Sequence, residues 1–111
     1  MIISKVNDIN FGVKFSQSAE NFFQEKINQR VKDRANFEQA VEQIKLLPSK
    51  DERDILDIGK SGEDKFVLLK VHNNANTSFL QLLYLAPNDN LSLAALKNIK
   101  ENIIDYISFR N

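Results

Sequence analysis

The residues that could do chemistry are few, and the first of them is the one histidine. His72 stands beside Asn73 and Asn74, between two apolar runs. A histidine acts as a catalytic base only beside a nucleophile or an orienting carboxylate, and as a metal ligand only with further ligands. The neighbouring sequence offers neither, so we predict a solvated loop histidine. The chain has no cysteine, which excludes disulfides and thiolate chemistry. No metal and no cofactor are expected.

Gly59, Lys60 and Ser61 match the last three positions of a phosphate-binding loop. That motif also requires a glycine five positions before Gly59, where this chain has Asp54. It requires a helix immediately afterwards, whereas the residues that follow are predicted to form a strand. We therefore interpret the three residues as part of a plain turn.

Carboxylates gather in the middle of the chain and could form a cation site or a nuclease site. Glu63 and Lys65 have the spacing of an acidic residue and a lysine found in restriction-endonuclease-like folds, but they stand where a turn is expected to end. We predict a solvated, charged rim instead. Its acidic members are Asp51, Glu52, Asp54, Asp57, Glu63 and Asp64.

A basic cluster lies in the first helical segment. Lys26, Arg30 and Arg34 are spaced by four residues, which aligns them along one face of a helix. Such a line could contact the phosphates of a nucleic acid or an acidic partner. Glu25 and Asp33 dilute the positive charge, and a solvated helix face is the alternative interpretation.

Composition narrows the class of protein. The chain has 111 residues, enough for a single domain over 1–111, with 42% hydrophobic and 27% charged residues. Fifteen basic and fifteen acidic side chains cancel, so no net charge draws it to nucleic acid or to an anionic membrane. No apolar run is long enough to span a membrane and no signal sequence is evident, so we expect a cytoplasmic protein. Frequent Asn, Lys, Ile and Phe are typical of AT-rich microbial, phage or plasmid genes.

The strongest structural signal is the stretch 66–86. Its apolar runs, 66–71 and 79–85, are separated by the polar cluster 72–78, a pattern that predicts two paired strands joined by a loop. Both runs are almost continuously apolar. Two explanations are open: the rest of the chain covers both faces of this hairpin, or one face is left exposed for a partner.

The stretch 18–47 repeats apolar residues at helical spacing until Pro48. Arg34 interrupts the apolar face, and Asn36 could cap a new helix. One long helix with a polar gap and two helices meeting near Ala35 are both open interpretations.

The remaining elements complete an α+β fold. We expect strands at 2–6 and 11–15, a strand at 55–58 followed by a turn over 59–65, and a final helix beginning after 88–90. Short loops favour an antiparallel meander over 55–85. The prediction is a two-layer sandwich in which helices cover one face of a small antiparallel sheet of about five strands, in the order ββα(α)βββα.

This order resembles the RelE/ParE-like toxins of bacterial toxin-antitoxin pairs. Residues 13–22, VKFSQSAENF, look like the opening strand and first helical turn of that family, and the similarity in pattern extends over 11–87. The resemblance implies a ribonuclease that cleaves messenger RNA with basic residues on its sheet and a late tyrosine or histidine. The positions here that match are Lys65, Lys70 and Tyr84, which would bind and polarise phosphate and assist proton transfer.

The hairpin and the last helix carry more apolar residues than one helix-on-sheet interface requires. A well-filled core is one explanation, and a surface for a protein partner or a second copy of the chain is the other. We favour a small non-enzymatic interaction protein, such as an inhibitor, immunity protein, antitoxin-like or accessory factor. A RelE-like ribonuclease and a weak nucleic-acid-binding protein are the alternatives. The expected partner-binding residues are Phe66, Leu68, Leu80, Leu82, Tyr84, Ile104 and Phe109.

Overall fold

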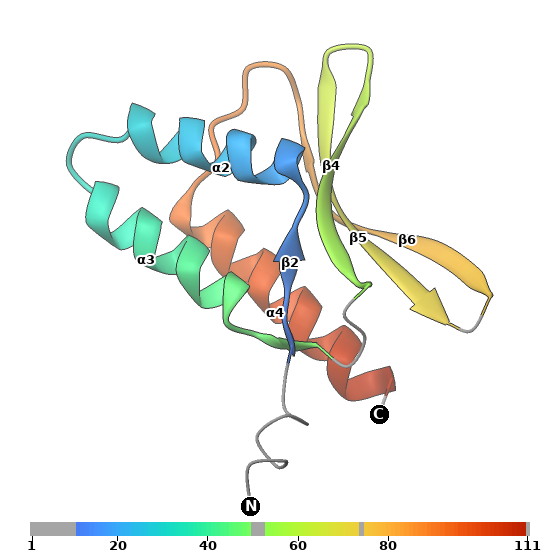
Figure 1. Ribbon diagram of the computed structural model, residues 1–111. Coiled ribbons are helices and arrows are strands. Elements are labelled where there is room, and N and C mark those ends of the chain that lie inside the picture. Colours follow the sequence, from blue (N-terminus) through green and yellow to red (C-terminus); the bar gives the residue numbers. More distant parts are fainter. Residues whose placement is uncertain (1–10, 50–52, 74, 111) are drawn as a thin grey trace, which may run out of the picture.

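The protein has a helical layer packed on one face of a twisted sheet (Figure 1). The structure, a computed structural model, describes residues 11–49, 53–73 and 75–110, and it describes the side chains of all of these except 11, 73 and 108–110. The two-layer α+β prediction is confirmed. The strand expected at 2–6 lies outside the described residues.

The main sheet has four strands in the order β2-β4-β5-β6. They are β2 (Lys14–Phe15), β4 (Ile55–Ser61), β5 (Asp64–Asn73) and β6 (Asn76–Leu85). The strands β4, β5 and β6 form the expected antiparallel meander, and β2 pairs parallel to β4, so the sheet is mostly antiparallel and has one parallel pair that was not predicted. The parallel pairing is feasible because two helices separate β2 from β4 and give the chain length to cross over. A separate small ladder joins β1 (Phe11–Gly12) to β3 (Pro48–Ser49).

The stretch 18–47, for which the sequence left open one long helix or two, forms two helices. Helix α2 (Gln17–Gln29) begins at Ser16, whose hydroxyl accepts a hydrogen bond from the Ala19 N–H, and α3 (Arg34–Lys45) follows an extended turn. The break falls at residues 30–33, before the expected junction near Ala35. The third described helix, α4 (Leu93–Arg110), is the one predicted at the end of the chain.

The hairpin between β4 and β5 is tighter than the sequence indicated. The strand β4 continues to Ser61, and the turn contains only Gly62 and Glu63, with Gly62 at a φ of 63°. A glycine adopts this left-handed conformation at little cost, which is why a two-residue turn forms here. The prediction of a turn over 59–65 is wrong, and the correction moves Lys60 and Lys65 into paired strands.

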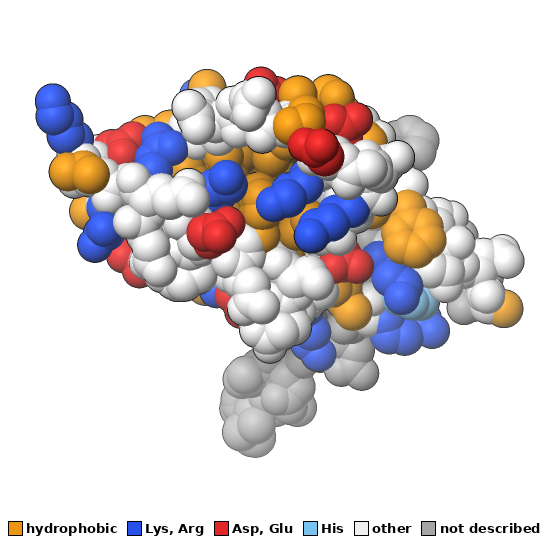
Figure 2. All heavy atoms as spheres, turned by 90° about the horizontal axis from the view of Figure 1, so that it is seen from above, with side chains coloured by type: hydrophobic (Ala, Val, Ile, Leu, Met, Phe, Trp, Pro, Cys, Tyr) orange, Lys and Arg blue, Asp and Glu red, His pale blue; other side chains and the backbone are white. Residues whose placement is uncertain are grey.

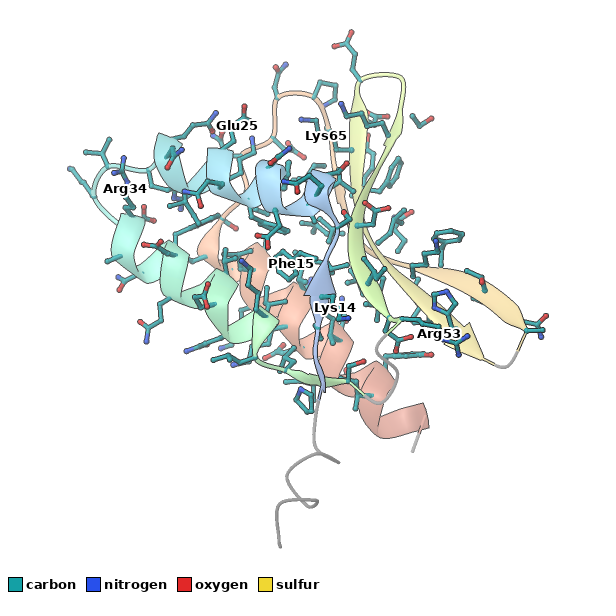
Figure 3. The ribbon with its side chains drawn as sticks, viewed as in Figure 1. Lys14, Phe15, Glu25, Arg34, Arg53 and Lys65 are labelled. Atoms are coloured by element: carbon teal, nitrogen blue, oxygen red, sulfur yellow. The ribbon has the colours of Figure 1, made fainter. Side chains whose placement is uncertain are left out.

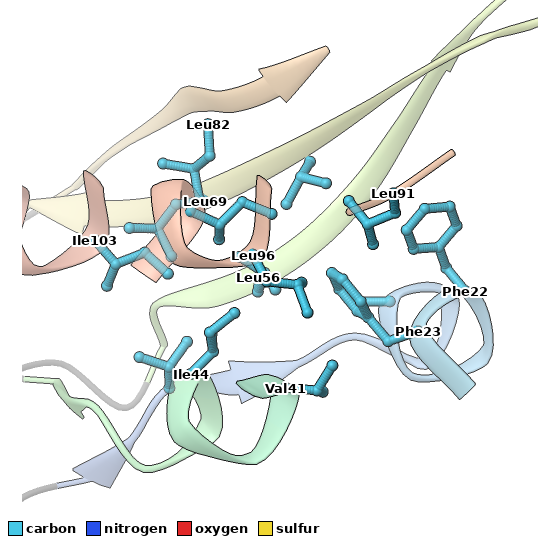
Figure 4. Packing of buried hydrophobic residues seen from close by; sticks show 14 of the residues in the cluster. Phe22, Phe23, Val41, Ile44, Leu56, Leu69, Leu82, Leu91, Leu96 and Ile103 are labelled. Atoms are coloured by element: carbon cyan, nitrogen blue, oxygen red, sulfur yellow. The ribbon is translucent and has the colours of Figure 1, made fainter. Parts of the chain in front are cut away.

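Alternate residues of the sheet face the helices and form the core (Figure 4). On β5 the inward side chains are Val67, Leu69 and Val71, each at most 5% exposed. The residues between them point to the other side of the sheet, because successive side chains of a strand alternate. From the helical layer the largest fully buried side chains are Phe23, Phe37, Ile44, Leu96, Ile99 and Ile103.

Candidate functional site

We call the side of the sheet away from the helices the open face. It carries several apolar side chains. The strand register places its members opposite one another: Phe66 pairs with Tyr84, and Lys70 lies between Ile55 and Phe79. Phe79 is 59% exposed and Tyr84 is 46% exposed. Sequence analysis did not single out Phe79, although its pairing position follows from strand alternation once the register is known.

Contacts join the apolar side chains at one end of the open face. The rings of Phe66 and Tyr84 lie with their centroids 5.3 Å apart at an interplanar angle of 48°. Leu68 leans over the neighbouring strand, since a Cβ atom added to Gly59 would come within 2.8 Å of Leu68 Cδ1. The absence of a side chain at Gly59 therefore lets the apolar surface extend from β6 across β5 to β4.

Two carboxylates next to the open face have structural partners. Asp57 accepts the hydroxyl hydrogen bond of Ser16 at 2.5 Å and the Ile58 N–H at 2.8 Å, which ties the start of α2 to β4. Asp54 is buried and accepts the N–H of His72 at 3.2 Å. His72 is half-buried, and its Nδ1 atom has no hydrogen-bond partner among the described residues. These groups support the sheet and do not form a triad or a metal site.

The pKa of Tyr84, on the open face, is clearly shifted from its ordinary value. Partial desolvation of the phenol raises its pKa above the ordinary value, and the negative charge and hydrogen bonding of Asp64 raise the pKa further, with a smaller effect from Asp89. The phenol is therefore neutral at physiological pH and is more resistant to ionisation than a free tyrosine. It can donate a hydrogen bond to a partner, but it is poorly suited to act as a base.

The three residues implied by the RelE resemblance do not converge. Lys70 and Tyr84 lie on the open face, whereas Lys65 shares the inward orientation of Val67 and points to the helical side. Tyr84 pairs with Phe66, four residues along β5 from Lys70, which corresponds to about 13 Å of strand. A single phosphate could not contact all three side chains.

The predicted partner-binding residues divide between the two layers. Phe66, Leu68 and Tyr84 share the open face, but Leu82 is only 8% exposed and belongs to the core. Leu80 is half-buried and also packs against the core. Ile104 is 40% exposed on α4, in the layer on the other side of the sheet, and the side chain of Phe109 lies outside the described residues. A single surface made from hairpin and final helix is therefore not formed.

Arg30 connects the turn after α2 to the chain before α4. Its Nε and Nη2 atoms donate to the two carboxylate oxygens of Asp33 at 2.9 and 2.7 Å, and Nη1 donates to the Leu91 carbonyl at 2.6 Å. The guanidinium also stacks on the Phe37 ring, 4.3 Å from its centroid. Hydrogen bonding to Arg30 holds the pKa of Asp33 below its ordinary value. Arg30, which was expected to contact phosphates, therefore has a structural role in joining two parts of the chain.

Arg34 caps the end of α2. Its guanidinium donates to the carbonyl oxygens of Arg30 at 3.2 Å and Asn28 at 3.0 Å, which otherwise lack partners at a helix C-terminus. Because α2 ends at Gln29, Lys26 is the only one of the three predicted cations that lies within this helix. Figure 3 shows Arg34 at the α2–α3 turn, away from Lys65 near the other end of α2. The prediction of one aligned basic face is wrong.

Comparison with known proteins gave no matching family model, no matching curated protein and no matching solved structure. Within the described ranges, no helix is long and apolar enough to cross a membrane. No group of three or more His, Cys, Asp or Glu side chains in the same ranges could hold a metal ion.

Proposed function

We propose that the protein is a small interaction protein that binds another protein through the open face of its sheet. One observation carries this proposal: Phe66, Leu68 and Tyr84 lie together on a side of the sheet that no described helix covers, and Phe79 is exposed farther along β6 on the same side. Contiguous exposed apolar surface of this kind marks interaction sites, and tyrosine and phenylalanine are enriched in them. The C-terminal helix is not part of the proposed surface, because it packs on the opposite side of the sheet.

The charges on the open face favour a protein partner over a nucleic acid. Lys14 and Lys70 stand on this face, but Asp57 and Asp64 lie on it too, so it carries no concentrated positive field. A nucleic-acid surface needs several unpaired cations along its length. Aromatic rings with a mixture of charges around them are typical of a protein interface.

The test compares partner capture by the open face with capture by apolar residues elsewhere. The double variant Phe66→Ser/Tyr84→Ser should fail to retain the partner that the wild type retains from lysate of its native host. Val31→Ser and Leu46→Ser are matched controls, since these side chains are 87% and 76% exposed away from the open face. All variants are first shown to be folded by circular dichroism and thermal unfolding.

Two outcomes are decisive. Loss of the partner in the Phe66→Ser/Tyr84→Ser variant, with retention in both controls, supports the proposal. Retention in all variants contradicts it. Light scattering of the purified protein identifies the special case in which the partner is a second copy, because the same double variant would then convert a dimer to a monomer.

A RelE-like ribonuclease is the second candidate, and one observation favours it. Lys14, Lys70 and Tyr84 occupy the same exposed side of the sheet, where an extended RNA could bind. If the protein is such a toxin, its expression should arrest growth, and Lys70→Ala/Tyr84→Phe should relieve the arrest. Normal growth on expression of the wild type would rule this candidate out and leave the interaction protein.

A further inference from the structure

A cavity of about 560 Å³ lies between α2 and the β4–β5 hairpin, on the helical side of the sheet. Its volume falls within the range of roughly 300–1,000 Å³ that is usual for small-molecule sites. Figure 2, which views the molecule from above, shows Lys and Arg side chains around apolar surface near the middle of that view. This cavity is on the other side of the sheet from the open face.

Two lysines in the cavity lining face each other across the strands. Lys60 pairs directly with Lys65, and both point inward, in line with Ile58 and Val67. The Cβ atoms of directly opposed residues in an antiparallel pair are about 4.5–5.5 Å apart, and like charges there destabilise the sheet. The strand register therefore places two positively charged side chains opposite each other, which costs stability.

A third lysine, Lys26 on α2, lies near the Phe22 ring but lines a different cavity, beside Arg30 and Leu91. The Nζ atoms of Lys26 and Lys65 each lie 5.4 Å from the centroid of the Phe22 ring, so they are at most twice that distance apart. Phe22 lines the first cavity, together with Ile58, and gives it an apolar floor. Ser18 and Asn21, on the same helix, add polar groups that can hydrogen-bond to a ligand.

Like most lysines among the described residues, these have no carboxylate partner, and Lys60 and Lys65 are set apart by lining the same cavity. Among the described residues, no carboxylate lies within 4.0 Å of the Nζ atoms of Lys26, Lys60 or Lys65. Lys45, in contrast, contacts Glu20 at 2.8 Å and also Glu42 at 3.9 Å. A cluster of unpaired ammonium groups at an apolar cavity is the arrangement expected at an anion site.

One acidic side chain, Glu25, shares the cavity lining. Two lysines against one carboxylate leave the lining with an excess of positive charge. The charge fits an anion, and the apolar floor fits a carbon skeleton attached to it. Phosphate monoesters combine both properties, since a phosphate monoester is close to doubly charged at pH 7.

We propose that this cavity binds a small organic phosphate, with the phosphate group held by Lys60 and Lys65 and the organic body lying on Phe22 and Ile58. The site is separate from the open face, so this inference and the proposed function stand or fall independently. A long polyanion is not the proposed ligand, because the cationic cluster is confined to one cavity and does not continue along the surface as a track.

The experiment titrates ligands into the full chain at low ionic strength and monitors binding by the chemical shifts of the amide resonances in NMR spectra. The phosphate probes are AMP and phenyl phosphate, and adenosine and inorganic phosphate are controls that lack the charge or the organic body. We expect both phosphate esters to shift resonances of Phe22, Ile58 and the two lining lysines at concentrations below about 5 mM, which corresponds to weak binding. Each control should bind at least several-fold more weakly.

Variants locate the binding site. Lys60→Gln and Lys65→Gln should each weaken AMP binding roughly tenfold, which is typical of losing one charged hydrogen bond. Lys32→Gln is the matched control, because Lys32 is an exposed lysine in the turn after α2, and it should leave AMP binding unchanged. Since these substitutions replace surface-accessible polar groups, thermal unfolding of each variant checks that a loss of binding is not a loss of fold.

Four results would overturn the proposal. The first is no shift with either phosphate ester, and the second is equal weakening by Lys32→Gln, which would indicate non-specific attraction. The third is binding of inorganic phosphate as tight as that of AMP, which would mark an adventitious ion only. A short RNA that binds far more tightly than AMP would also overturn it, in favour of a nucleic-acid site.

Discussion

Replacing Lys60 by glutamate should make the free protein more stable. In the wild type, Lys60 and Lys65 are directly paired on the same side of β4 and β5, and neither has a carboxylate partner among the described residues. The variant Lys60→Glu turns a repulsive cross-strand pair into an attractive one. Cross-strand charge pairs contribute about 0.2–1 kcal/mol in either direction, so the full reversal should raise the free energy of unfolding by about 1 kcal/mol.

The same substitution should abolish binding of organic phosphates. Stability and binding would then move in opposite directions, which is typical of residues retained for function at a cost in stability. Lys60→Gln removes the repulsion without adding an attraction, so its gain in stability should be about half as large. This intermediate variant separates the effect of charge from any effect of side-chain size.

Urea unfolding followed by circular dichroism is the assay, performed at about 20 mM and at about 1 M NaCl. The gain of the Lys60→Glu variant should be present at low salt and largely screened at high salt. Two results would refute the reasoning: a variant no more stable than the wild type at low salt, or a gain that persists unchanged at high salt. Either would mean that the two ammonium groups do not repel each other in the folded state.

Four further predictions concern the fold and Tyr84. Phe37→Ala should lower the free energy of unfolding by about 3–5 kcal/mol in a urea titration, because Phe37 is completely buried. Gly12→Ala should cost about 1–3 kcal/mol in the same assay, since the new Cβ would come within 2.6 Å of the Lys45 carbonyl oxygen, whereas a neutral result would show that this contact relaxes freely. Because the pKa of Tyr84 is raised in the folded state, the phenol of the unfolded chain loses its proton at a lower pH than the phenol of the folded chain. The free energy of unfolding should therefore fall as pH rises from the ordinary tyrosine pKa toward the raised one. The Tyr84→Phe variant should lack this part of the pH-dependent fall. Asp64→Asn should bring the pKa of Tyr84 back toward its ordinary value in a spectrophotometric titration, and an unchanged pKa would exclude Asp64 as a cause.

The elements with strong periodicity could be predicted from sequence alone. The final helix was expected from apolar residues at helical spacing, and Leu96, Ile99 and Ile103 of that pattern are the residues it buries. The hairpin over 66–86 was expected from two apolar runs, and they form β5 and β6. The local sequence pattern is enough to predict an element when its apolar periodicity alone indicates both its secondary structure and its buried face.

The features that depend on distant contacts could not be predicted. The break after α2 is stabilised by Arg30, which donates to the carbonyl of Leu91, a residue 61 positions away. Without knowledge of that contact, the spacing of Lys26, Arg30 and Arg34 looked like one helical face. A sequence pattern cannot show that a cation is engaged by a carbonyl from another part of the fold.

The candidate sites were missed for a related reason. Assigning residues 59–65 to a turn hid the alternation of Leu56, Ile58 and Lys60, which continues the inward face of β4 to the edge of the cavity. A two-residue turn at Gly62 would have paired Lys60 with Lys65 and exposed the cluster. For the open face, the apolar runs indicated a surplus, but only the strand register separates Phe66 and Tyr84 from the buried Leu82.

Site-specific photo-cross-linking in the native host tests the interaction surface most directly. A photoreactive phenylalanine analogue is placed at Phe66, in the open face, and in a parallel strain at Leu46, which is exposed beyond the end of α3. We predict a discrete covalent adduct from position 66 and none from position 46. Adducts of equal yield at both positions, or an adduct from position 46 alone, would contradict the assignment of the open face as the partner-binding surface.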